Sequence, residues 1–453
     1  MNRELRKVVA PASKTIWIAI LALSLPRLAL IAFGQVLSGD DGDRYLLEAL
    51  NLWSHGTFST DSGAHPSPTA HDLPLFPLLM AGLLVIFKNT VIVVRIVAVL
   101  NCVLFCVAAR GVYALAHRLT GHDGTALTAM LVFGVFPESF PYSVFYMPEA
   151  LFLALFVWCL VNFSDYGRTG AGRALPWTFV LWGLSTLTKP IAVFFGPALA
   201  VVAFLIAFRQ RHLRNPQTVK IMASFCLGLL LILPWMVRNY VDFREVGISS
   251  ITGSQLFDYN YRYLLEELGV QDPPAVMAER EAAAIAAIPP DSNPMVVAKA
   301  RGKVAQAEIL SHLGAYAWMS IKRHWRLYAG TGAVATLRLL GDTEACQALQ
   351  NASGGPHSWS SIPARAITLQ LASWLILGLA YAAALLGLAS LMKDGEWSTF
   401  WWLVLVVAYF ALLIGPVTAT RYRMAMLPAL SIAAAIGLNR LWMLRRTGRT
   451  ARA

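Results

Sequence analysis

Three carboxylates stand within four residues in the segment LSGDDGDRYLLEALNLWSHGTF (37–58): Asp40, Asp41 and Asp43. An aspartate at the start of a helix often caps free backbone N–H groups, so capping is one interpretation of each acid. Three acids exceed what one cap needs, and a carboxylate held at a membrane–water boundary can serve as a general base. Both interpretations stay open on the residues alone.

The residues behind these acids predict the element that positions them. Tyr45, Ala49, Leu52 and Trp53 recur at helical spacing, which indicates a short amphipathic helix lying along a bilayer surface. The acids then lie at its N-terminus. His71 closes the polar loop 59–72 that follows the helix.

Further ionisable residues stand at the ends of apolar runs. Glu149 follows Pro148 at the start of YMPEALFLALF, where it either favours the helix dipole or is functional. Arg238 ends an apolar run, a place where a cation also suits the dipole. Lys189 either lines a cavity or ends a broken helix.

Arg421 and Arg423 flank Tyr422 at the start of the last apolar run. A helix N-terminus is unfavourable for a cation, and snorkelling accounts for one such arginine more easily than for two. Two guanidinium groups at a lipid boundary suit a phosphate group, because their planar forks match its oxygens.

Composition sets the class of protein. The 453 residues are 57% hydrophobic and 14% charged, with several apolar runs near the length of about 20 residues that spans a bilayer. The net charge of +12 lies in short Lys/Arg blocks between these runs, so nucleic acid is not expected as a partner. The five cysteines form neither a metal motif nor a disulfide framework. The spacing of His55, His65 and His71 favours loop residues over a zinc site.

An all-α, polytopic membrane fold with about ten transmembrane helices follows. The basic N-terminus is expected in the cytoplasm by the positive-inside rule, and 14–37 lacks a cleavage site and is expected to remain as the first helix. The predicted parts are an N-terminal module (1–241) whose first outer loop (38–73) carries the acids, an outer loop domain (242–365), and C-terminal helices with a basic tail (366–453). We expect 74–87 to be re-entrant or interfacial, 295–313 to be helical and WMSIKRHWRLY (318–328) to be interfacial.

The ordered motifs of this chain resemble those of the GT-C glycosyltransferases, in the dolichyl-phosphate-mannose–protein mannosyltransferase-like branch that includes the aminoarabinose transferase of lipid A. The similar segments cover nearly the whole membrane portion. They are DGDRYLLEALNL, PLFPLLMAGLLVIF, VVRIVAVLNCVLFCVAARGVYALAHRLTG, YMPEALFLALF, LSTLTKP, PWMVRNYVDFREVGISSITG and TRYRMAMLPAL.

The resemblance implies roles for particular residues. The family's catalytic aspartate falls on Asp41, with Asp40 as the alternative if the register shifts by one, and its second acid falls on Glu149. The family often has Glu after the aspartate, whereas this chain has Gly42. The large C-terminal soluble domain of some relatives is also missing, so acceptor recognition is expected from 59–72 and 242–365.

The chemistry expected is inverting transfer of a sugar from a polyprenyl-phosphate donor to a hydroxyl of an extracytoplasmic acceptor, at the outer face of a bacterial inner membrane. A phosphate leaves without a proton donor, so one base suffices where glycosidases use two carboxylates. We expect Asp41 as the base, Arg238, Arg421, Arg423 and Lys189 around the phosphate, and Asp43, Tyr45 and His71 shaping the substrate site. A divalent cation is possible but not required, and membrane lipids are expected partners.

The alternative is a transporter or a flippase for lipid-linked sugars. Such a protein is expected to bind its cargo near the bilayer midplane on broken helices, in a fold with an internal repeat. The acids of this chain fall instead at one predicted face, and no repeat is visible.

Overall fold

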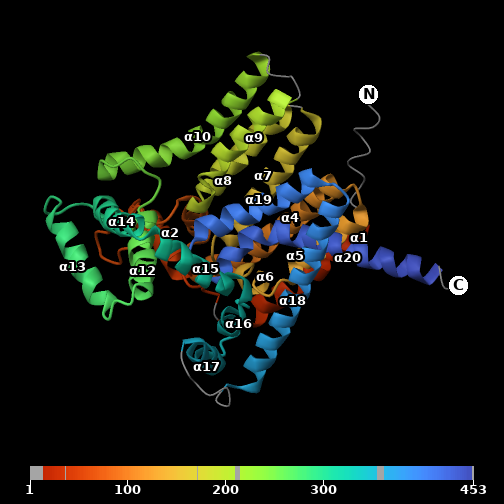
Figure 1. Cartoon of the computed structure of the whole chain (residues 1–453). Coiled ribbons are helices and arrows are strands. Elements are labelled where there is room, and N and C mark those ends of the chain that lie inside the picture. Colours follow the sequence, from red (N-terminus) through yellow and green to blue (C-terminus); the bar gives the residue numbers. More distant parts are fainter. Residues whose placement is uncertain (1–13, 36, 171, 210–214, 355–361, 451–453) are drawn as a thin grey trace.

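The computed structural model describes residues 14–35, 37–170, 172–209, 215–354 and 362–450 (Figure 1). Most of the basic N-terminus (1–13), residues 210–214, and the end of the basic tail (451–453) lie outside the described residues. Over the described ranges the secondary structure is helical and contains no strand, so the predicted all-α, polytopic membrane fold is confirmed.

Eight helices in the described residues are long and apolar enough to cross a membrane. Two shorter apolar helices, α3 (Leu75–Phe87) and α5 (Asp123–Val135), and the short helix α8 (Leu175–Thr186) lie between them in the chain, so the predicted count of about ten is compatible with the structure. The long spans contain α1 (Lys14–Phe33), α4 (Thr90–Thr120), α7 (Glu149–Thr169), α9 (Phe195–Arg209), α10 (Asn215–Phe243), α18 (Ala364–Lys393), α19 (Trp397–Ile414) and α20 (Leu427–Thr450). The span of α9 includes the turn Pro190–Ala192 before it, and that of α20 begins at Thr420.

Local sequence sets where these helices begin and end. The side chain of Asn89 accepts a hydrogen bond from the Ile92 backbone N–H at 3.0 Å and caps α4. Gly121 ends α4 in the left-handed region at φ 73°, which glycine adopts without a steric penalty. His117 and Arg118 in the last turn complement the negative end of the helix dipole.

Small residues bring α18 and α20 together. A Cβ atom added at Gly387 would lie 1.9 Å from the carbonyl oxygen of Ala433, and one at Gly437 would lie 2.0 Å from that of Ala383. Only glycine allows these backbones to approach so closely, as is common between helices in membranes.

A fully buried arginine ties α1 to the bundle. Arg27 donates hydrogen bonds to the Leu23 and Gly134 carbonyls, at 2.7 and 2.8 Å, and to the hydroxyls of Ser139 and Ser143. Its guanidinium also lies over the rings of Phe105 and Phe140. Among the described residues it makes no ion pair with a carboxylate.

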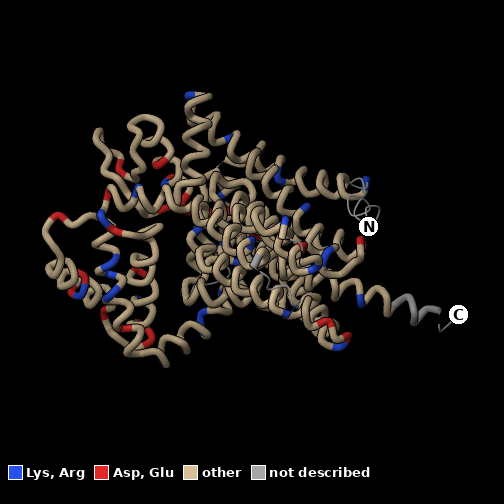
Figure 2. Tube along the Cα trace, turned by 90° about the horizontal axis from the view of Figure 1, so that it is seen from above, with Lys and Arg blue, Asp and Glu red and all other residues tan. Residues whose placement is uncertain are grey.

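A lobe of shorter helices projects from one side of the bundle, opposite the side where the N- and C-termini lie (Figure 1). Charged residues are frequent in this lobe and at the ends of the long helices, whereas the middle of the bundle is largely uncharged (Figure 2). The lobe and the segment beneath it comprise α11 (Ile251–Gln255), the π-helical turn η3 (Leu256–Tyr261), α12 (Arg262–Glu267), α13 (Pro273–Ala286), α14 (Pro294–Ser311), α15 (Leu313–Ala329), α16 (Ala333–Leu339) and α17 (Thr343–Gly354).

The amphipathic helix predicted behind the acids is α2 (Gly42–His55). Tyr45 and Ala49 are buried against Phe76 and Met80 of α3 (Leu75–Phe87), while Trp53 lies exposed. Hydrogen bonds from Ser250 to the carbonyl of Ala70 and from Ser249 to that of His71 join the loop after α2 to the lobe. The two segments therefore lie at the same end of the bundle.

Candidate active site

Asp41 is held between two arginines at the N-terminus of α2. One carboxylate oxygen accepts a hydrogen bond from Arg421, and the other lies 3.0 Å from Nη1 of Arg44. Asp41 occupies the N-cap position, but its side chain accepts no backbone N–H bond. Of the two interpretations of this acid, the structure therefore does not support the cap.

The surroundings of Asp41 favour its ionised form. Partial burial alone would raise the pKa of this carboxyl, but the charges and hydrogen bonds of Arg421 and Arg44 lower it below its usual range. Asp41 is thus an anion in this conformation, with both oxygens engaged by cations.

The two neighbouring acids have other partners. Asp40 forms an ion pair with Arg338 of α16, and both side chains are substantially exposed. Asp43 accepts hydrogen bonds from the hydroxyls of Tyr146 and Ser38. Of the three clustered acids, Asp41 is the one that the structure places against Arg421.

Glu149 and Lys189 form a buried ion pair at 2.6 Å. Glu149 begins α7, whereas Lys189 lies in the break between α8 and the turn Pro190–Ala192. Burial raises the pKa of Tyr45 in α2, and the charges of Asp72 and Glu149 add to this effect. Glu149 therefore lies near the helix that follows the three acids. The ring of Tyr45 is buried edge-on against Phe76.

Arg238 lies at the end of α10 and organises the loop 59–72. It donates to the Thr69 carbonyl at 2.7 Å, pairs with Asp242 at 2.9 Å, and lies over the rings of Phe58, Trp235 and Phe243. These contacts hold the loop in place. The guanidinium of Arg238 is therefore occupied by the protein, and we assign Arg238 a positioning role.

The stabilised loop forms one wall of a cavity of about 350 Å³. Hydroxyl side chains and basic residues dominate its lining, and His71 lies among them with a pKa lowered by burial. Its lining residues are Arg44, Thr60, Thr69, His71, Ser250, Ser254, Pro294, Val297, Ala298 and Arg301. Because Arg44 binds Asp41 and also lines this cavity, the carboxylate and the cavity share a wall.

Arg423 lies in the protein interior and binds only other groups of the protein. It is fully buried, forms an ion pair with the equally buried Glu138, and donates to the carbonyls of Leu327, Tyr328 and Gly330 at 2.7–2.8 Å. All of its nitrogens therefore have partners, and we leave Arg423 out of the phosphate site proposed below.

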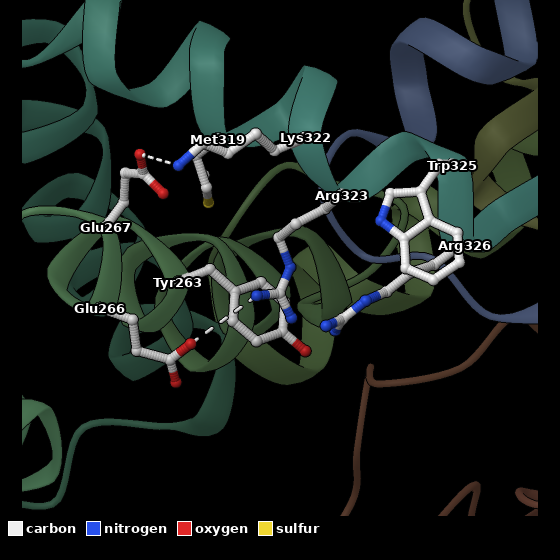
Figure 3. A pocket seen from close by; sticks show the side chains of 8 residues that line it. All are labelled: Tyr263, Glu266, Glu267, Met319, Lys322, Arg323, Trp325 and Arg326. Atoms are coloured by element: carbon white, nitrogen blue, oxygen red, sulfur yellow. Dashed lines mark hydrogen bonds and ion pairs between the residues drawn. The ribbon is translucent and has the colours of Figure 1, made fainter. Parts of the chain in front are cut away.

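A second cavity, of about 300 Å³, lies between α12 and α15 (Figure 3). Lys322 pairs with Glu267 at 2.6 Å, and Arg323 lies 3.4 Å from the ring centroid of Tyr263 and 3.7 Å from Glu266. Trp318, Ile321 and Trp325 of α15 are exposed, and the interfacial position of 318–328 stays a prediction. Most of the positive charge of this segment is thus neutralised within the lobe.

Sequence reasoning missed three residues of the site: Arg44, Glu48 and Asp72. Asp72 forms an ion pair with Arg44, and Glu48 is fully buried. Glu48 lies three residues after Tyr45, on the same helical stripe as Ala49. A carboxyl on the apolar face of a helix was the signal available in the sequence.

The glycine that replaces the family's usual Glu has a steric reason. A Cβ atom added at Gly42 would lie 2.9 Å from Oγ of Ser38 and 3.0 Å from the ring of Tyr146. Tyr146 and Ser38 therefore occupy the space that a side chain at position 42 would need. No group of three or more His, Cys, Asp or Glu that could hold a metal ion is found in the described part of the chain.

Comparison with known proteins places this geometry in context. A family model described as dolichyl-phosphate-mannose-protein mannosyltransferase matches residues 64–237, and no curated protein matches the sequence. The crystal structure of the oligosaccharyltransferase of Archaeoglobus fulgidus, tethered with an acceptor peptide, is 15% identical with a TM-score of 0.53. The similarity covers 96% of this chain and 50% of that one, so this chain spans about half the length of the oligosaccharyltransferase.

ArnT from Cupriavidus metallidurans, bound to undecaprenyl phosphate, is 14% identical with a TM-score of 0.41, over 95% of this chain and 79% of that one. The family match and the fold shared with the oligosaccharyltransferase confirm the resemblance found in the sequence. This chain is an integral membrane protein that is similar, over residues 64–237, to the dolichyl-phosphate-mannose–protein mannosyltransferases and shares its fold with the oligosaccharyltransferase of Archaeoglobus fulgidus.

Proposed function

We propose that this protein is an inverting glycosyltransferase that moves a sugar from a polyprenyl-phosphate donor to a hydroxyl of an extracytoplasmic acceptor. The observation that carries the proposal is Asp41, an ionised carboxylate that caps no helix and lies between Arg421 and Arg44. The match to a family described by dolichyl-phosphate-mannose supports a lipid-phosphate sugar as the donor.

The proposed reaction balances with one base. The acceptor oxygen forms a bond to the anomeric carbon, its proton passes to Asp41, and the bond from that carbon to the phosphate oxygen breaks. The polyprenyl phosphate leaves as an anion and needs no proton. Positive groups that meet the developing phosphate charge lower the barrier.

Arg421 is the principal phosphate ligand in this proposal. Its Nε atom is buried without a hydrogen-bond partner in the described residues, so a donor remains for a ligand. While Arg421 binds Asp41 it lowers the basicity of that carboxylate. A donor phosphate that draws Arg421 away would therefore restore the basicity of Asp41 in the complex that needs it.

Lys189 serves as a second cation in this proposal, and Glu149 holds it. The cavity that shares Arg44 with the site offers an acceptor or sugar the hydroxyls of Thr60, Thr69, Ser250 and Ser254. Its volume of about 350 Å³ lies within the usual range of small-molecule sites. His71 lines it and is the residue we expect to contact the acceptor.

The location proposed for the site is the outer face of a bacterial inner membrane. The acidic segment and the lobe lie at the same end of the bundle, opposite the side that carries the chain termini (Figure 1). A site at one end also disfavours the alternative of a transporter or flippase, whose cargo site is expected near the midplane.

Donor turnover by the full chain tests the proposal. We expect purified protein in nanodiscs to release polyprenyl phosphate from at least one member of a panel of undecaprenyl-phosphate and dolichyl-phosphate monosaccharides. In parallel, mass spectrometry of envelope glycolipids and glycoproteins from cells with and without the protein should identify the modified acceptor. Transbilayer movement of the intact donor without its cleavage would contradict the transferase and favour the flippase.

A further inference from the structure

Glu48 is a buried carboxyl group whose surroundings offer it no hydrogen-bond donor. Its side chain is 0% exposed, and neither of its oxygens has a partner in the described residues. Glu48 lies one helical turn after Arg44 on α2, and Arg44 pairs with Asp72, so the carboxylate of Asp72, which is 4% exposed, is its acidic neighbour. Two ionised carboxylates cannot bond to each other, because both accept hydrogen bonds and neither donates.

We propose that Glu48 and Asp72 share one proton, and that this proton positions Asp72 to hold Arg44 against Asp41. Glu48 is the proton-bearing member, since Asp72 already accepts hydrogen bonds from Nε and Nη2 of Arg44. A neutral Glu48 donates its O–H to the carboxylate of Asp72 and leaves no buried charge without a partner.

The charge balance of the surrounding groups supports this assignment. Each cation there already has at least one ionised partner: Arg421 pairs with Asp41, Arg44 with Asp41 and Asp72, and Arg238 with Asp242. Three cations thus face three carboxylates before Glu48 is counted. A fourth negative charge in this buried group would be uncompensated, whereas a protonated Glu48 keeps the group neutral.

On balance, the surroundings of Glu48 raise its pKa and favour the neutral carboxyl. Burial raises the pKa of Glu48 above its ordinary range, and the negative charge of Asp72 adds to this effect. Arg44 and Arg238 oppose the shift, but both are already paired with other carboxylates. The surroundings of Glu48 therefore favour its neutral form.

Two contacts of Arg44 connect the Glu48–Asp72 pair to Asp41, the candidate base. Asp72 fixes the guanidinium of Arg44, and Nη1 of the same guanidinium lies 3.0 Å from Asp41. Glu48 touches no reacting atom and is a positioning residue. Its effect on transfer rests on the proposed function, whereas the shared proton does not.

Infrared spectroscopy tests the proton directly. We expect the wild-type protein, labelled with ¹³C-glutamate in an ester-free detergent at neutral pH, to show an isotope-shifted C=O band of a protonated carboxyl. Glu48→Gln should remove this band and keep the fold, because its amide N–H₂ can donate to Asp72. A wild-type spectrum without the band, or a band that survives in Glu48→Gln, would overturn the shared proton.

The pH dependence of the thermal midpoint gives a second readout. A carboxyl whose pKa is raised in the folded state binds a proton that the unfolded chain has lost, so folding stability falls as pH rises above the ordinary Glu range. Between about pH 5 and about pH 9 the wild type should therefore lose stability relative to Glu48→Gln. Parallel curves for the two proteins would also contradict the proposal.

Donor turnover separates this inference from the proposed function. Glu48→Gln should keep most of the wild-type rate, whereas Glu48→Leu should lower kcat on the order of 10²-fold with KM little changed, since Arg44 and Asp41 lose their alignment. Equal rates for the Leu and Gln variants would contradict the positioning role of Glu48, but they would not contradict the shared proton. If the wild type turns over no donor, the infrared and thermal results still decide whether the proton is shared.

Discussion

Arg421 and Arg423 are two residues apart in the turn Thr420–Met426, yet the structure uses them in opposite ways. Arg423 is sealed in the interior, where Glu138 and three carbonyls take all of its nitrogens. Arg421 binds Asp41, approaches the Tyr422 hydroxyl at 3.4 Å, and keeps a buried Nε without a partner. An arginine with every donor satisfied stabilises the fold, and one with a donor left over can bind a ligand.

Asp41, the partner of Arg421, gives the largest expected effect. Asp41→Asn keeps the shape and the capacity to cap a helix, but it cannot accept a proton. We expect turnover of the donor to fall by roughly 10²–10⁴-fold with donor binding nearly unchanged. Rapid-quench measurement of polyprenyl phosphate release, beside equilibrium binding, separates the two quantities.

Asp43→Asn is the matched control, because Asp43 is held by Tyr146 and Ser38 rather than by Arg421. A fully active Asp41→Asn beside an inactive Asp40→Asn would place the base one residue earlier. If both were fully active, the transfer would not use a carboxylate base in this segment.

Arg423 is expected to control stability. Arg423→Ala leaves Glu138 as a buried charge without a partner, which typically costs about 3–5 kcal/mol of folding free energy. The thermal midpoint in detergent should drop accordingly, and the double variant Arg423→Met/Glu138→Leu should recover most of the loss. A stable Arg423→Ala with weakened binding of polyprenyl phosphate would reverse the roles assigned to the two arginines.

Arg421 is expected to control donor binding by a smaller amount. Arg421→Ala should weaken binding of undecaprenyl phosphate in nanodiscs by about 1.5–3 kcal/mol, the usual contribution of a hydrogen bond to a charged group. Arg421→Lys should restore only part of the affinity, because lysine lacks the planar fork. Unchanged affinity in both variants would move the phosphate site to Lys189 or to the α15 segment.

The smallest expected effect is on the response to acid. Asp41 has a lowered pKa in the folded protein, so its ion pairs stabilise the fold above the ordinary Asp range, and this stabilisation is lost as pH falls through the lowered value. Arg421→Ala removes one of the two pairs and should shift this loss to higher pH. Thermal midpoints of the two proteins across the acid range measure the shift, and coincident curves would contradict the pairing.

The sequence was sufficient for the membrane fold, since apolar runs of membrane-spanning length are local signals. An acidic cluster beside an amphipathic helix is also a local signal, and it made Asp41 the predicted base, a role that stays a prediction. The sequence could not separate Arg421 from Arg423, because the two flank the same tyrosine, and what distinguishes Arg423 is its contacts to Glu138 and to the carbonyls after Arg326. Those partners are distant in the chain. The roles of Arg44 and Asp72 could not be predicted for the same reason, because their ion pair joins α2 to the end of the loop 59–72.

Arg27 has a consequence for the order in which the protein assembles. α1 precedes most of the groups that bind Arg27 in the chain, and a cation in a spanning segment that faces lipid costs about 2.5–3.5 kcal/mol on insertion scales. The groups that solvate Arg27 come much later, since its hydrogen bonds to Gly134, Ser139 and Ser143 span 107, 112 and 116 residues. In a nascent chain that ends after α4, Arg27 has only the Leu23 carbonyl and the Phe105 ring of these partners, so we expect α1 to pack stably only once the turn after α5 has been synthesised.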